Sequence, residues 1–157
     1  YYPNELRNEI DDINELIYSK VNNGVYQAGF SSNQVAYEEA FDALFGAFEI
    51  LEDRLSKQRY LCGERITEAD WRLFPTLFRF DAVYHYAFKC NKKHLYQYPN
   101  LWGFTRDLYQ QPGIAEICYL EEAKLGYWSG PKINPLGTIP KGPDIDFDER
   151  HDRDRFN

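Results

Sequence analysis

The most informative absence in this sequence is methionine. None occurs in the 157 residues, and the first residue is Tyr1. Because translation normally starts with Met, we expect the sequence to be a segment of a longer protein. A functional prediction must therefore address the parent protein as well as these residues.

Long apolar runs and clustered basic residues are also missing. No stretch approaches the run of about 18 apolar residues that a membrane-spanning helix needs, and no signal peptide is recognisable. The net charge is −7 and no basic stripe is present, so nucleic acid and anionic membranes are poor partners. These absences favour a cytoplasmic protein that binds neither of them.

Cysteine and histidine are too few and too scattered to predict a metal site. Cys62, Cys90 and Cys118 are odd in number and lack metal-type spacing, which favours a reduced, cytoplasmic setting. Lysines beside Cys90 would lower the pKa of its thiol, but we interpret all three cysteines as packing residues. The histidines are far apart in the sequence and predict no metal centre: His85, His94 and His151.

Aromatic residues, by contrast, are abundant. They make up 17% of the chain and include 13 Tyr and 11 Phe. Such a composition predicts either a core rich in rings or a pocket lined by them. The apolar residues recur at spacings of three and four, and no strand-like alternation of useful length occurs. We therefore predict an all-α fold, a bundle of about five main helices.

The central element is expected to be a helix that starts after Thr67 and extends to about Phe80. Thr67 and Asp70 have the spacing of a capping box, in which each side chain bonds to the backbone of the other. Ile66 and Trp71 are placed as a hydrophobic staple across this start. The following side chains leave almost no polar face, which is typical of a helix buried at the centre of a domain.

Two long helices are predicted before the central one. The first spans about residues 3–22 and ends at Gly24, because glycine suits the left-handed position after a last helical turn. A loop follows, and Ser31 with Gln34 has the pattern of a capping box for a second helix that extends to about Lys57. These helices should form an antiparallel pair.

The second half of the chain is predicted to contain shorter helices and an extended tail. Further helical segments are expected at residues 81–88, 98–110 and 114–127. We interpret Arg79 and Asp81 as a buried ion pair. From Trp128 onwards, prolines and glycines interrupt any periodicity. The expected division is a helical domain at residues 1–128 and a tail at residues 129–157.

Several of these motifs resemble a known family. The Thr-Glu-Ala-Asp capping box at residues 67–70 resembles the one that opens the central helix of the C-terminal α domain of the glutathione transferases. Four further stretches extend the resemblance over essentially the whole chain, at residues 21–30, 79–84, 88–91 and 132–135. Together they are similar to the glutathionyl-hydroquinone reductases, also called the Xi class.

The resemblance implies a two-domain enzyme of which these residues are the helical part. Its N-terminal thioredoxin-like domain, absent here, binds glutathione and carries a nucleophilic cysteine. That cysteine takes the glutathionyl group from a glutathionyl-hydroquinone, and a second glutathione releases it as the disulfide. The helical domain lines the hydroquinone site and forms the homodimer interface. Alone, it is expected to be inactive.

The resemblance also implies site residues. Tyr26 matches the tyrosine that faces the reactive sulfur and the quinone, where its hydroxyl would donate to a substrate oxygen. Tyr127 matches a second site tyrosine by its spacing to Asn134 and Pro135, although its neighbours are unusually rich in glycine. Tyr84 matches a ring of the quinone pocket, and a purely structural position in the core is an equally good interpretation.

Two other functions remain open from the sequence. One is a transferase-like α domain that serves only as a protein-interaction module. The other is a different class of glutathione transferase, with conjugating or thiol-transferase activity. The tail and the Asn-Asn-Gly-Val-Tyr stretch at residues 22–26 argue against the latter.

Overall fold

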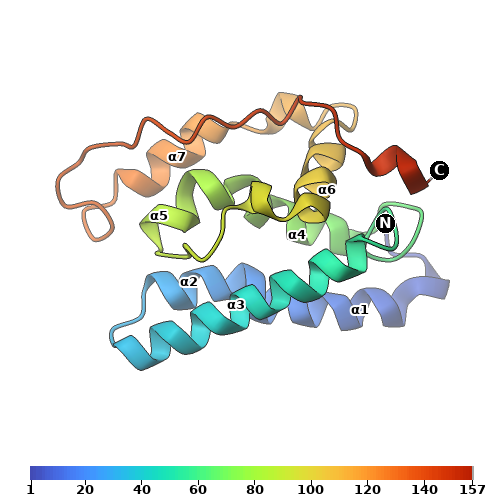
Figure 1. The fold of residues 1–157 in the computed structure, drawn as a ribbon, viewed down its shortest axis with the longest axis horizontal. Coiled ribbons are helices and arrows are strands. Elements are labelled where there is room, and N and C mark those ends of the chain that lie inside the picture. The colour runs from blue at the N-terminus through green and yellow to red at the C-terminus, as the bar shows by residue number, and fades with distance from the viewer. Residues whose placement is uncertain (157) are drawn as a thin grey trace.

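A computed structural model describes residues 1–156, and their regular secondary structure is entirely helical. Within these residues the extended pairing is limited to one isolated bridge between Tyr60 and Gly63. The prediction of an all-α fold is confirmed. In Figure 1, α1, α2 and α3 lie along one side of the molecule, α4 and α5 cross the middle, and α7 lies on the other side with the tail beside it.

The first helix does not end at Gly24, so that prediction was wrong. The chain forms one nearly continuous helix made of α1 (Arg7–Leu16), a π-helical segment (Ile17–Asn22) and α2 (Asn23–Gly29). Val21, Val25 and Ala28 are buried along it. Burying this apolar face outweighs the cost of about 1 kcal/mol for a glycine inside a helix.

The second long helix, α3 (Gln34–Leu55), starts two residues later than the sequence predicts. Its N-cap is Asn33, whose side chain accepts a hydrogen bond from the backbone N–H of Ala36 at 2.9 Å. Because α2 extends to Gly29, Ser31 lies in the turn and its hydroxyl donates back to the carbonyl of Gln27 at 2.6 Å. The two helices nevertheless pack as the expected antiparallel pair (Figure 1).

The predicted capping box does open the central helix, α4 (Glu68–Arg79). The buried carboxylate of Asp70 accepts hydrogen bonds from the backbone N–H of Thr67 at 2.7 Å and from its hydroxyl at 2.8 Å. It also accepts from the backbone N–H of Leu61 at 2.8 Å, which fixes the preceding connector. α4 contacts α1, α6 and α7, as expected of a central helix.

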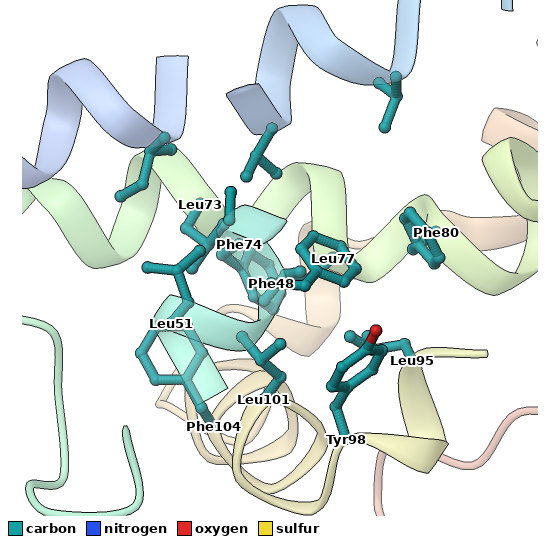
Figure 2. Close-up of a cluster of buried hydrophobic side chains, with 14 of the residues drawn as sticks. Phe48, Leu51, Leu73, Phe74, Leu77, Phe80, Leu95, Tyr98, Leu101 and Phe104 are labelled. Carbon is teal, nitrogen blue, oxygen red and sulfur yellow. The ribbon is translucent and has the colours of Figure 1, made fainter. Parts of the chain in front are cut away.

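The remaining helices surround α4. A π-helical segment (Phe80–Tyr84) and α5 (His85–Ala87) continue it, and α6 (Pro99–Tyr109) and α7 (Leu120–Trp128) follow. Single 3-10 turns occur at Asn4–Leu6, Leu95–Gln97, Ala115–Ile117 and Arg153–Phe156. Figure 2 shows where α3, α4 and α6 meet, with Phe48, Leu77 and Leu101 pointing toward one another. The core thus lies around the central helix.

Asp81 has different partners from those predicted. Its carboxylate accepts a hydrogen bond from the backbone N–H of Leu95 at 2.7 Å and lies 3.5 Å from Nδ1 of His94. The Arg79 guanidinium instead lies 3.5 Å from the carbonyl of Pro75, one turn earlier. The expected Arg79–Asp81 pair was wrong. Arg79 is the last residue of α4 and Asp81 lies in the π-helical segment that follows, so the two side chains have different neighbours.

The residues after α7 lie over the helices. Phe147 is buried, and its ring packs against those of Phe78 and Tyr109, 5.0 and 5.2 Å away between centroids. Arg153 is completely buried, and its Nη2 donates to the carbonyl of Leu55 at 2.8 Å. The same nitrogen donates to two carbonyls of the connector that follows α3, those of residues 58 and 59, at 2.6 and 2.9 Å. The tail therefore caps the C-terminal end of α3.

Candidate functional site

The three tyrosines singled out from the sequence meet at one place. Tyr26 comes from α2, Tyr84 from the π-helical segment that follows α4, and Tyr127 from α7. The hydroxyl of Tyr127 is hydrogen-bonded to that of Tyr26, and it lies 3.0 Å from that of Tyr84. Residues separated by 101 and 43 positions along the chain thus form one hydroxyl cluster.

The structure corrects the setting of Tyr26. The sequence predicts a loop, but Tyr26 lies on α2, because the helix continues past Gly24. Two π-helical segments bear on the cluster: one ends four residues before Tyr26, and the other contains Tyr84. Such segments change which residues share a helix face and are frequent at functional sites. Here they set the direction in which the two tyrosines leave their helices.

The three tyrosines differ in their exposure. Tyr84 is 1% exposed, Tyr127 is half-buried and Tyr26 is 38% exposed. Burial raises the pKa of Tyr84 far above its ordinary value, and burial also raises the pKa of Tyr127. Both hydroxyls therefore keep their protons at neutral pH. The cluster forms a short chain of hydroxyls that leads from the core to the surface at Tyr26.

Two phenylalanines complete the wall of this site, and sequence reasoning did not assign them to it. Phe88 is fully buried, and its ring lies 5.3 Å from those of Tyr26 and Tyr84. Phe30 is 58% exposed and stacks on Tyr26 at 6.3 Å. Phe30 could be assigned to this site only once the end of α2 was known.

Gly29 allows this packing. A Cβ added at Gly29 would lie 2.3 Å from Cγ of Phe88, closer than any real side-chain contact. Glycine is therefore required at the end of α2 because the Phe88 ring occupies the space that a side chain would need. The last turn of α2 therefore packs directly against the Phe88 ring of the site.

The surface between α4 and α7 is hollowed. A groove of about 530 Å³ is lined chiefly by apolar residues, namely Trp71, Phe74, Pro75, Phe78, Ile114, Ile117, Cys118, Tyr119 and Ala123, together with Arg79 and Glu122. A second hollow of about 320 Å³ is lined by Arg79, Ala123, Gly126 and Tyr127. Arg79 and Ala123 line both. The groove therefore leads to the Tyr127 end of the hydroxyl cluster.

Trp71 contacts two other aromatic rings and lines the groove. Its indole packs edge-on against Phe74, 6.0 Å away, and against Tyr1, 6.1 Å away. It is half-buried rather than part of the closed core, and one side lines the groove. Trp128, the last residue of α7, donates from Nε1 to the carbonyl of Ala82 at 3.3 Å.

The cysteines have the properties of packing residues. Cys62 and Cys90 are buried, and burial raises the pKa of Cys62 to about 11 and that of Cys90 to about 12. Cys118 is half-buried, and its pKa is also raised by burial. Since the thiolate is the reactive form, these thiols are poor nucleophiles near neutral pH.

Residues 1–156 contain no group of three or more His, Cys, Asp or Glu side chains that could hold a metal ion. None of the helices in that range is both long enough and apolar enough to cross a membrane.

Comparison with known families places the fold. A profile described as the C-terminal domain of glutathione S-transferase matches residues 34–107. Two solved structures align closely. One is the glutathione-bound YqjG of Escherichia coli K-12, with a TM-score of 0.96 and 49% identity over 98% of this chain and 50% of that one. The other is a Xi class transferase from Natrialba magadii, with a TM-score of 0.95 and 45% identity over 98% and 47%.

Two curated relatives point the same way. The glutathionyl-hydroquinone reductase YqjG of Escherichia coli is 50% identical over 98% of this chain and 47% of its own length. The glutathionyl-hydroquinone reductase PcpF of Sphingobium chlorophenolicum is 49% identical over 91% and 46%. The chain thus spans about half the length of these relatives. It belongs to the glutathione transferases as a helical domain of the C-terminal type, of the kind found in the glutathionyl-hydroquinone reductases.

Proposed function

We propose that the parent protein is a glutathione-dependent reductase that removes glutathione from glutathionyl-hydroquinones. It would release the hydroquinone and glutathione disulfide. In this proposal the present chain provides the hydroquinone side of the active site. One observation carries the proposal: in a chain about half identical to two such reductases, Tyr26, Tyr84 and Tyr127 converge with their hydroxyls in contact.

The proposed roles follow from exposure and hydrogen bonding. Tyr26 is the outermost hydroxyl, so it would donate to the oxygen of the bound hydroquinone and stabilise negative charge that develops there. Tyr127 holds the Tyr26 hydroxyl and would contact the substrate from the second hollow. Tyr84 is buried, so its ring would close the floor of the site and its hydroxyl would hold Tyr127.

The other parts of the proposal concern the rest of the parent protein. A preceding thioredoxin-like domain would bind most of the glutathione and provide the nucleophilic cysteine, since the thiols of this chain are protonated at neutral pH. Residues 1–128 would form the helical domain and residues 129–157 its tail. We further propose a cytoplasmic homodimer assembled through this domain, and that the domain alone is inactive.

The test is the glutathione-dependent release of hydroquinone from its glutathionyl adduct by the full-length parent. Tyr26→Phe and Tyr127→Phe should each lower kcat/KM by tenfold or more, which corresponds to about 1.4 kcal/mol of lost transition-state stabilisation. Tyr18→Phe is the matched control, because Tyr18 is exposed, lies near the start of the π-helical segment and takes no part in the hydrogen bonds of the cluster. It should keep full activity.

Two results would contradict the proposal. If the folded wild-type parent does not turn over the adduct, the interaction-module alternative becomes the better explanation. If the wild type is active but both tyrosine variants match Tyr18→Phe, the reaction does not use this cluster. Turnover by the 157 residues alone would contradict the prediction that the domain is inactive.

A further inference from the structure

Among the nine residues of α7, only Lys124 is buried, and it is a charged residue. It is 4% exposed, whereas the apolar residues of this helix are half-buried or exposed. A lysine is almost never buried to this extent unless it is paired. Yet no carboxylate of residues 1–156 lies within ion-pair distance of Lys124. Charge pairing therefore does not explain its burial.

The ammonium group of Lys124 joins α7 to the tail. Its Nζ donates to the backbone carbonyl of Lys141 at 2.9 Å. Beyond Lys141 the tail is fixed on other helices, because Phe147 packs on rings of α4 and α6 and Arg153 donates to the last carbonyl of α3. Figure 1 shows the tail running beside α7. The hydrogen bond of Lys124 thus ties a short helix to an anchored segment.

The position of α7 depends on such ties. A helix of nine residues is too short to be stable alone, and this one buries little apolar surface. Its last residue, Trp128, donates to the carbonyl of Ala82, and the Trp128 carbonyl accepts from Nδ2 of Asn134 at 2.9 Å. These bonds hold only the C-terminal end of α7. Lys124 adds a second attachment point about one turn earlier, which fixes the direction of the helix and its rotation about its axis.

Tyr127 lies between these two attachment points. It follows Lys124 by three residues, so the two side chains are neighbours on the helix surface. Its hydroxyl is bonded to those of Tyr26 and Tyr84, which come from other helices. A group that takes part in a reaction has to be held within about 0.5 Å of its productive position. A small rotation of α7 would therefore be enough to take the Tyr127 hydroxyl out of the cluster.

We propose that Lys124 is a positioning residue, which orients Tyr127 by tying α7 to the tail. This proposal rests on the proposed function, in which Tyr127 contacts the substrate. Lys124 itself does not touch the substrate and acts only through the orientation of α7. Replacing buried charges with apolar residues of similar size is often neutral or stabilising. The ammonium group is therefore retained for the orientation of the helix rather than for the stability of the domain.

The first experiment measures reductase activity of the full-length parent in two backgrounds. Lys124→Met removes the ammonium group but keeps the apolar stem, and it should lower kcat/KM at least fivefold. Lys124→Arg keeps a charged donor and should recover most of this loss. In the Tyr127→Phe background, Lys124→Met should cost less than a further twofold, because both changes act through the same hydroxyl. The control is Lys132→Met, since Lys132 is exposed in the tail, and it should keep full activity.

The second experiment measures amide hydrogen exchange in the same full-length variants. In Lys124→Met the amides of α7 should exchange at least fivefold faster than in the wild type, while those of α4 keep their protection. This readout needs no turnover, so an inactive wild type would count against the proposed function alone.

Three results would overturn the positioning role of Lys124. The first is that Lys124→Met unfolds the domain, because the tie would then be a general requirement for the fold. The second is that the amides of α7 exchange in Lys124→Met as they do in the wild type. The third is that Lys124→Met lowers kcat/KM by the same factor with and without the Tyr127 hydroxyl.

Discussion

The two ends of the central helical stretch both bury polar groups, but they satisfy them differently. At the start of α4, one carboxylate, that of Asp70, accepts from three donors that lie within ten residues of it. At the far end, three hydroxyls from distant parts of the chain bond to one another. The first arrangement uses its hydrogen-bonding capacity to fix the chain. The second keeps spare capacity and faces solvent at Tyr26.

The comparison indicates how this domain separates stability from chemistry. A buried polar group that is fully satisfied locks the backbone around it, and removing it leaves several groups without partners. A partly exposed hydroxyl cluster loses little when one hydroxyl is removed, since water can take its place. We therefore expect substitutions at the Asp70 end to act mainly on stability and those at the tyrosine end mainly on function.

The largest effect is expected from removing the Asp70 carboxylate. Asp70→Ala leaves the N–H groups of Leu61 and Thr67 and the Thr67 hydroxyl without their acceptor in a buried setting. The free energy of unfolding should fall by about 4 kcal/mol, at 1–3 kcal/mol for each unsatisfied group. Urea unfolding followed by circular dichroism measures this loss.

Asp42→Ala is the control for that experiment, because Asp42 is exposed on α3. It should change the free energy of unfolding by less than about 0.5 kcal/mol. Equal losses of unfolding free energy in the two variants would mean that the buried Asp70 carboxylate stabilises the fold no more than the exposed Asp42 carboxylate does.

A smaller effect is expected where the tyrosine end is most tightly packed. Gly29→Ala places a methyl group 2.3 Å from Cγ of the buried Phe88 ring. Overpacking of this kind should cost about 2–3 kcal/mol and displace the ring that contacts Tyr26 and Tyr84. Near-ultraviolet circular dichroism and thermal unfolding measure the two consequences.

Gly46→Ala provides the matched control for Gly29→Ala. Gly46 lies inside α3, and a Cβ there meets nothing within 4 Å. That change should raise the stability by about 0.5–1 kcal/mol through helix propensity alone. If both alanine variants are stabilised, the wall at Phe88 is looser than the packing indicates.

The smallest effect is a pH dependence next to the tyrosine end. His85 stacks on His94 at 3.7 Å, and burial together with His94 lowers the pKa of His85 to about 4. The unfolded value is near 6.5. Because the folded pKa is the lower one, neutral His85 favours the fold above pH 6.5, and this contribution is lost as the pH falls from 6.5 toward 4.

At pH 5 the expected loss from His85 is at most about 2 kcal/mol relative to pH 7.5. Urea unfolding of wild type and His85→Gln at both pH values measures it. The wild type should lose more stability on acidification than the variant. Identical pH profiles would mean that His85 is not protonated on unfolding in this range.

The parts of the fold that could be predicted are those encoded by residues close together. The capping box of Thr67 and Asp70 lies within one helical turn, so its hydrogen bonds follow from spacing alone. The stop at Gly24 was wrong, because the burial of Val21, Val25 and Ala28 against other helices decides whether that turn continues. The Arg79–Asp81 pair was wrong for the same reason, since the π-helical segment that follows Arg79 and contains Asp81 depends on packing.

Some residues of the candidate site could likewise be predicted from the sequence, and others could not. Tyr26, Tyr84 and Tyr127 were nominated through a resemblance in short motifs, but spacing alone does not bring their hydroxyls together. Phe30 and Phe88 could be assigned to the site only after the ends of α2 and α5 were known. The sequence also assigned Arg79 an ion-pair partner, Asp81, that the structure does not give it.

By itself, the sequence determined the helical class, the start of the central helix and the motifs of the family. These depend on hydrogen bonds and apolar spacing within a few residues, where the chain entropy of bringing groups together is small. Only the tertiary structure decided that the first helix passes Gly24, that Arg153 caps α3 from the tail, and that three hydroxyls meet. Those outcomes depend on burial gained across segments far apart in the chain, which no local pattern records.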